Sequence, residues 1–175
     1  METIFNLLVI FQASSIALGV GASTLAISSF LVALYDGQID TSERRMLGVI
    51  YWALRTAMVG ILLTSAAIYA FDSEFFGTFN QFLVVLLGVL FANAIGMTLK
   101  VVPGKIGPAL QAGTWYTLGF LVTIHMFELF PIDWVVFFGL YIAVVALALS
   151  IVNLYLTFIM KKNNRSDKNY SNENK

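Results

Sequence analysis

The sequence predicts an all-α protein, a polytopic bundle of five transmembrane helices, and composition is the first reason. Hydrophobic residues make up 59% of the 175 residues and charged residues 11%, whereas a typical soluble domain has about 25% charged residues. The mean hydropathy is +0.84. Because so few charged groups cannot cover a globule in water, we expect lipid to surround most of the surface.

The length of the apolar segments is the second reason. Crossing about 30 Å of hydrocarbon takes about 20 mostly apolar residues, and five segments are this long. Helices are expected because a backbone in lipid must satisfy its hydrogen bonds within its own segment. The expected helices form one domain over residues 1–160 and cover about residues 4–35, 46–71, 79–99, 106–127 and 132–160. Residues 161–175 are polar and rich in Asn, and are expected to form a disordered cytoplasmic tail.

Local signals mark the breaks between these segments. Asp40 and Glu43 have the spacing of a capping box that starts the second helix. Pro103 separates the third helix from the fourth. Pro131 can occupy the first turn of the last helix, where its missing N–H has no partner to lose.

The distribution of Lys and Arg predicts the orientation, because cytoplasmic loops are enriched in both. The loops on one side of the five segments hold nine basic residues: Arg44, Arg45, Lys100, Lys105, Lys161, Lys162, Arg165, Lys168 and Lys175. The loops on the other side hold none, and carry Glu2, Asp72, Glu74, Glu128 and Asp133. The sequence therefore predicts a multi-pass protein of the cell membrane, with the N-terminus outside and the C-terminus in the cytoplasm.

A weak internal similarity suggests a parallel duplication of a two-helix hairpin. Gly19 aligns with Gly88, and Gly60 aligns with Gly119. Both hairpins would run in the same direction, as in some transporters. Apolar helices also match by chance, so the sequence leaves duplication and coincidence equally open.

The first helix carries a stripe of small residues. Such stripes allow close helix packing in lipid, where association depends on van der Waals contact and on the approach of backbones. We therefore interpret the stripe as a packing surface. Its members are Gly19, Gly21, Ala22, Ser23, Ala26 and Ser28.

A belt of polar residues is the main candidate site. If the second helix starts near Met46, Arg55 lies roughly 13 Å from the cytoplasmic edge, close to the midplane. An Arg at the centre of a span costs about 2.5–3.5 kcal/mol to insert, so it usually faces protein or water. We therefore expect Arg55 to face the interior, at the depth of one polar group from each other helix: Thr24, Asn93, Thr114 and Asn153.

The role of this belt has several interpretations. Arg55 could bond Asn93, Asn153 and free carbonyl groups, or extend along its stem to the cytoplasmic face. It could instead bind an anion, a lipid phosphate or a carboxylated solute, or pair with an acidic residue of another subunit. No Asp or Glu of this chain lies at its depth.

Other chemistry finds little support in the sequence. The chain has one His and no Cys, which argues against disulfides, thiolate metal sites and Cys nucleophiles. His125 and Glu128 are weak candidates for a metal site, and an interfacial hydrogen bond explains them better. No cofactor is expected, no pattern resembles an active site, and a formal net charge of zero indicates no nucleic-acid partner.

The first two expected helices resemble a group of uncharacterised multi-pass bacterial membrane proteins. The residues that carry this resemblance are Gly19-Val20-Gly21-Ala22-Ser23-Thr24, Asp36-Gly37 and Asp40. More distantly, the layout is similar to the membrane bundles of the copper-resistance D and HemJ-like group. The resemblance covers about a third of the chain and implies a bundle fold. In the HemJ-like group a His of an early helix binds haem, whereas the first helix here has Phe11 and Gln12 and no His.

Three functions follow as hypotheses. The first is a transporter or channel-like protein with an anion site around Arg55. The second is a non-catalytic membrane subunit or scaffold in which the polar belt only joins helices. The third is a haem- or quinone-associated redox module. The expected partners are the lipid bilayer and a second copy of the chain or another membrane protein.

Overall fold

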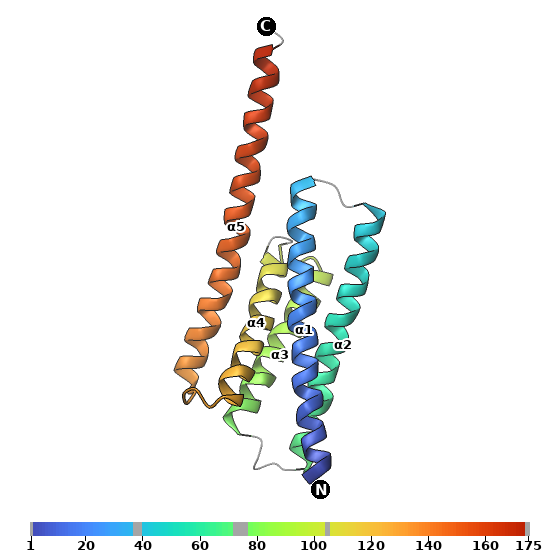
Figure 1. The fold of residues 1–175 in the computed structure, drawn as a ribbon, viewed down its shortest axis with the longest axis vertical. Coiled ribbons are helices and arrows are strands. Elements are labelled where there is room, and N and C mark those ends of the chain that lie inside the picture. The colour runs from blue at the N-terminus through green and yellow to red at the C-terminus, as the bar shows by residue number, and fades with distance from the viewer. Residues whose placement is uncertain (1, 37–39, 72–76, 104–105, 174–175) are drawn as a thin grey trace.

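The computed structural model is a bundle of five α-helices, and no strand occurs among the residues that it describes, 2–36, 40–71, 77–103 and 106–173. The helices are α1 Glu2–Asp36, α2 Thr41–Phe71, α3 Thr78–Thr98, α4 Ile106–Met126 and α5 Trp134–Glu173. Consecutive helices run in opposite directions, so the two termini lie at opposite ends of the molecule (Figure 1). The all-helical prediction is therefore confirmed.

Four of the helices are long and apolar enough to cross a membrane. They contain the candidate spans Thr3–Val32, Thr41–Phe71, Thr78–Thr98 and Trp134–Ile159. Four helices rather than five thus support the prediction of an integral membrane protein. The helix outside this set is α4, which includes Gln111, Thr114 and Thr117 among its residues.

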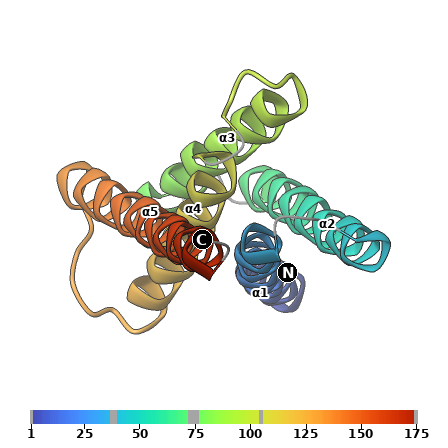
Figure 2. The same cartoon turned by 90° about the horizontal axis from the view of Figure 1, so that it is seen from above.

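The environment of α4 explains its lower hydrophobicity. This helix contacts α1, α3 and α5, and Figure 2 shows it between α3 and α5. Neighbouring helices rather than lipid thus surround much of α4, which can carry polar side chains if the bundle satisfies them. Its buried residues are Gly107, Ala109, Gln111, Ala112, Gly113, Thr114, Trp115, Thr117, Leu118, Leu121 and Ile124.

A reciprocal capping box sets the start of α2. The Glu43 N–H donates to Asp40 Oδ1 at 2.7 Å, and the Asp40 N–H donates to Glu43 Oε2 at 3.0 Å. These bonds satisfy two N–H groups that a helix start would leave free. The predicted cap is confirmed, and α2 begins at Thr41 rather than near residue 46.

The boundaries of α5 differ from the expected ones. Asp133 Oδ1 accepts the Val136 N–H at 2.8 Å, so α5 begins at Trp134 and Pro131 lies before the helix rather than in its first turn. At the other end the helical backbone continues to Glu173 through a segment expected to be disordered. No Gly or Pro occurs between Met160 and Glu173 to end the helix.

The turn between α3 and α4 is short. The Val101 and Val102 N–H groups both donate to the Gly96 carbonyl, at 2.9 and 3.2 Å. Pro103 follows, and its carbonyl accepts the Ile106 N–H at 2.9 Å. The predicted break at Pro103 is confirmed. At this end of the bundle, α1 and α2 extend past the ends of α3 and α4 (Figure 1).

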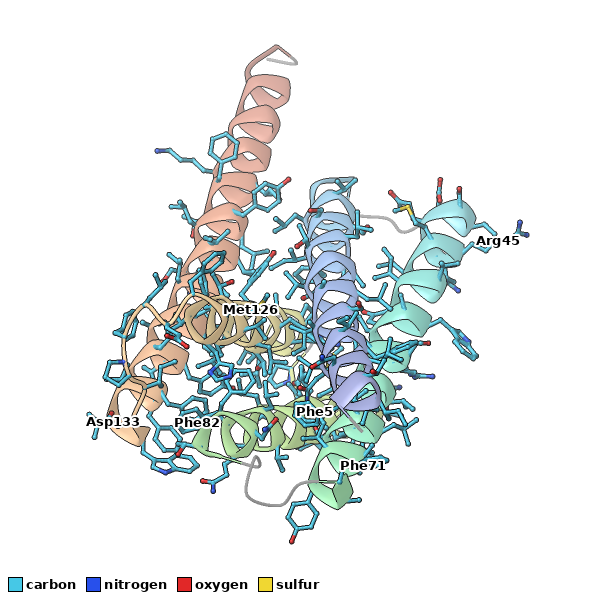
Figure 3. All side chains as sticks on the ribbon, turned by 60° about the horizontal axis from the view of Figure 1, so that its bottom comes forward. Phe5, Arg45, Phe71, Phe82, Met126 and Asp133 are labelled. Carbon is cyan, nitrogen blue, oxygen red and sulfur yellow. The ribbon has the colours of Figure 1, made fainter. Side chains whose placement is uncertain are left out.

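Aromatic rings join α3 to α5 at the opposite end. Phe82 stacks on Phe137 with 4.4 Å between ring centroids, and meets Trp134 edge-on at 4.8 Å. Figure 3 shows Phe82 on α3, on the same side of the bundle as Asp133 at the start of α5. These rings hold the first turn of α5 against α3.

The small residues of α1 divide between two faces. A Cβ on Gly19 would overlap Trp115 Cζ3, and Ala22 and Ser23 are buried. A Cβ on Gly21 would meet nothing within 4 Å, and Ser28 is exposed. The packing interpretation therefore holds for one side of the predicted stripe.

The proposed duplication has no equivalent packing at Gly60 and Gly119. A Cβ on Gly60 would overlap Ser15 Oγ, across the α1–α2 hairpin to which Gly60 belongs. A Cβ on Gly119 would lie 3.2 Å from Val20 Cγ2, which is on α1 rather than on its own hairpin partner α3. The duplication stays a prediction.

Of the charged residues behind the predicted orientation, four lie outside the described residues: Asp72, Glu74, Lys105 and Lys175.

Candidate functional site

Arg55 lies on the outside of the bundle, so the expectation of an interior position is wrong. Its side chain is exposed and lines a groove of about 400 Å³ between α2 and α3. It makes no hydrogen bond or ion pair with the residues that the structure describes. The other groove residues are Met58, Val59, Phe91, Ala94, Ile95, Thr98 and Leu99.

The level of Arg55 also differs from the expected midplane. Arg55 lies about 21 Å along α2 from Thr41, at about 1.5 Å per residue. The groove that it shares with α3 reaches Thr98 and Leu99, where α3 ends. Counting depth along one helix assumed that all helices start at the same level, whereas α2 extends past the end of α3 (Figure 1).

Asn93 is buried and joins α3 to α4. Its Nδ2 donates to the Gly107 carbonyl at 3.0 Å and lies 3.7 Å from Met97 Sδ. Its Oδ1 has no hydrogen-bond partner among the described residues. Asn93 therefore anchors the start of α4 and does not meet Arg55.

Thr114 and Thr24 each meet a tyrosine of another helix. Thr114 Oγ1 lies 3.3 Å from the Tyr141 hydroxyl of α5 and donates to the Leu110 carbonyl at 2.8 Å. Thr24 Oγ1 lies 3.0 Å from the Tyr116 hydroxyl of α4. Both threonines of the predicted belt thus join helices, but in two separate pairs.

Asn153 is the fifth residue of the predicted belt, and it is exposed on α5. Its carbonyl accepts the Thr157 hydroxyl at 2.9 Å. The structure therefore brings together neither Arg55 with Asn93 nor Arg55 with Asn153, and the belt is not one continuous site.

Sequence reasoning missed the tyrosines and one further polar link. Gln12 Nε2 of α1 donates to Ser65 Oγ of α2 at 2.9 Å, and both side chains are buried. A tyrosine or glutamine within an apolar segment requires a partner for its polar group. That requirement was a usable signal that Gln12, Tyr116 and Tyr141 have hydrogen-bond partners. Identifying each partner also required the relative depths of the helices, which the sequence does not give.

Trp115 fills the centre of the bundle. It is fully buried, and its six-membered ring lies against Gly19. Its Nε1 has no hydrogen-bond partner in the described part of the chain. The apolar cluster around it includes Leu54, Ala57, Ile61, Leu86, Leu90, Leu118 and Leu121.

A second cavity, of about 470 Å³, lies at the opposite end of the bundle from the Arg55 groove, where α3 begins. The His125 ring stacks on Phe79 with 4.1 Å between centroids and 11° between planes, and Glu128 also lines the cavity. His125 thus has a ring contact rather than the expected interfacial hydrogen bond. Within the described ranges, no group of three His, Asp or Glu side chains could hold a metal ion.

No family model, curated protein or solved structure matches this chain.

Proposed function

We propose that this chain is a non-catalytic integral membrane protein of five spans that acts as a subunit or scaffold within the membrane. The observation that carries the proposal is the packing around Trp115. A fully buried indole against Gly19, ringed by Leu, Ile and Ala side chains, fills the level at which a transporter would hold a solute.

The interior hydroxyl groups support the same reading. Thr114 and Thr117 donate to the carbonyls of Leu110 and Gly113, both at 2.8 Å. A hydroxyl that bonds the preceding turn of its own helix offers less to a passing solute. Thr114 also lies 3.3 Å from the Tyr141 hydroxyl and so joins α4 to α5.

We take α4 as the fifth span. Its 21 residues give a length of about 31 Å, enough to cross the hydrocarbon. Contacts with α1, α3 and α5 shelter its polar side chains. Five spans put the termini on opposite sides, and the one-sided basic loops favour an outside N-terminus and a cytoplasmic C-terminus in the cell membrane.

Transport around Arg55 has less support. A permeation site needs access from both sides of the membrane through the bundle, whereas the Arg55 groove opens on the outer surface of α2 and α3. A haem or quinone module has less support as well, because the single His125 stacks on Phe79 at one end of α4.

Cysteine labelling tests the five-span arrangement, since the chain has no Cys of its own. Four exposed positions serve as single-cysteine variants: Ser42→Cys, Thr78→Cys, Val101→Cys and Leu129→Cys. An impermeant maleimide on intact cells should label positions 78 and 129, and should reach 42 and 101 only after permeabilisation. Labelling of 101 and 129 on the same side would remove α4 from the spans.

Flux assays separate the scaffold from the transporter. The purified protein in liposomes should show no flux of chloride, phosphate or small carboxylates above protein-free vesicles. A flux that Arg55→Met abolishes and Arg45→Met leaves unchanged would restore the transport hypothesis.

A further inference from the structure

Arg55 lies within the candidate span Thr41–Phe71, and its charged group has no hydrogen bond or ion pair with the residues that the structure describes. A guanidinium is permanently charged, and its fixed fork of N–H donors fits the oxygens of a phosphate. In surroundings poor in water such a group requires an anion. The described residues around the groove supply none.

The walls beside Arg55 are apolar and long. Met58 and Val59 continue the groove along α2, while Phe91 and Ile95 line it on α3. Thr98 supplies the other polar side chain. One cationic group at the end of an apolar groove is complementary to a molecule with an anionic head and a hydrocarbon chain.

The groove reaches the level where a headgroup would lie. Helical side chains lean toward the N-terminus of their own helix, and the N-terminus of α2 lies at the same end of the bundle as the C-terminus of α3 (Figure 1). Arg55 therefore leans toward the end of α3. Lys100, which directly follows the groove residue Leu99, is exposed at that end and adds a second positive charge.

We propose that the groove between α2 and α3 binds an anionic phospholipid, with Arg55 and Thr98 on the phosphate and an acyl chain along Met58, Phe91 and Ile95. A free phosphate ion would leave the apolar walls unused. A second copy of the chain would have to bring a carboxylate to this level. The candidate spans Thr3–Val32, Thr78–Thr98 and Trp134–Ile159 hold no Asp or Glu, and the single one in Thr41–Phe71 is Glu43, in the first turn of α2.

Native mass spectrometry of the full-length protein tests the site. The probes are phosphatidylglycerol and phosphatidylcholine with the same acyl chains, titrated into detergent. Arg55→Gln should weaken phosphatidylglycerol binding about tenfold and leave phosphatidylcholine binding unchanged. The matched control is Arg45→Gln, which removes the same charge from a side chain that projects away from the bundle (Figure 3), and should weaken binding no more than about twofold.

Two further measurements identify the occupant. Ala94→Phe fills the groove wall and keeps Arg55, so it should also weaken phosphatidylglycerol binding. Inorganic phosphate should not displace the bound lipid. Equal lipid binding by Arg55→Gln and Arg45→Gln, full binding by Ala94→Phe, or displacement by phosphate would each overturn the proposal. A smaller oligomer in Arg55→Gln, with lipid preference intact, would assign the groove to a second copy instead.

Discussion

The ring of Trp115 occupies the space in which a side chain on Gly19 would begin, and this contact sets how closely α1 and α4 approach. The indole makes many dispersion contacts with the surrounding Leu and Ile side chains, each small but large in sum. Its buried Nε1 has no partner among the described residues, which costs part of that gain. Trp115 therefore joins the two helices by packing, beside the hydrogen bond between Thr24 and Tyr116.

Gly19→Ala should destabilise the protein by about 1–3 kcal/mol, because the new methyl group overlaps the Trp115 ring. Gly21→Ala is the matched control, since a Cβ there meets nothing within 4 Å. It should leave stability unchanged or raise it by up to about 1 kcal/mol. Thermal unfolding in detergent measures both, and equal melting temperatures for the two variants would refute the Trp115 contact.

Arg55→Met should leave the melting temperature in detergent unchanged or raise it. The variant keeps much of the apolar stem and removes a charge that has no partner in the described part of the chain. Arg45→Met provides the comparison at an exposed site outside the groove. A clear fall in melting temperature for Arg55→Met alone would show that Arg55 supports the bundle through a contact not seen here.

At the scale of the element, α4 shows how a bundle relaxes the demand for hydrophobicity. Polar side chains of α4 such as Gln111 and Thr117 are buried, because α1, α3 and α5 rather than lipid pack against this helix. The start of α4 is fixed by Asn93, which bonds the Gly107 carbonyl from α3. A polar side chain thus aligns the two short helices.

Asn93→Leu should destabilise the protein by about 1–3 kcal/mol, because the Gly107 carbonyl would lose a buried donor. Asn153→Leu provides the control: its side chain is exposed on α5, so it should leave the unfolding free energy nearly unchanged. Both substitutions remove one amide from the belt that the sequence predicts. An equal loss of stability in the two variants would contradict a stabilising role for the Asn93–Gly107 bond.

At the scale of the whole molecule, sequence reasoning succeeded where the signal is local. Long apolar segments and the Asp40–Glu43 cap predicted five helices, and the expected ends of the third and fourth lie within one residue of the observed ones. The end of α5 differs most, because its helix continues to Glu173. The level of Arg55 could not be predicted in the same way, since the offset between helices depends on contacts such as Trp115 on Gly19. The pairs Thr24–Tyr116 and Thr114–Tyr141 depend on the same offsets.

The unequal lengths of the helices impose a hydrophobic mismatch on the surrounding bilayer. The span Thr78–Thr98 has 21 residues and Thr41–Phe71 has 31, which correspond to about 31 and 46 Å of helix. Figure 2 shows α3 tilted relative to α1, which shortens its projection along the bundle further. With its tilt, α3 is close to the minimum length for a span and presents a thinner flank than α2, and the surrounding lipids would adapt to this difference at a modest cost per ångström.

Thermal stability should consequently depend on acyl-chain length. In vesicles of short-, medium- and long-chain phosphatidylcholine, we expect the melting temperature to fall in the longest chains, where the polar end of α3 at Lys100 would be drawn into hydrocarbon. Equal melting temperatures across the series would argue against such a thin flank. A membrane protein with one thin and one thick flank favours boundaries between bilayer regions of different thickness, so its distribution within a membrane would follow from the length of α3.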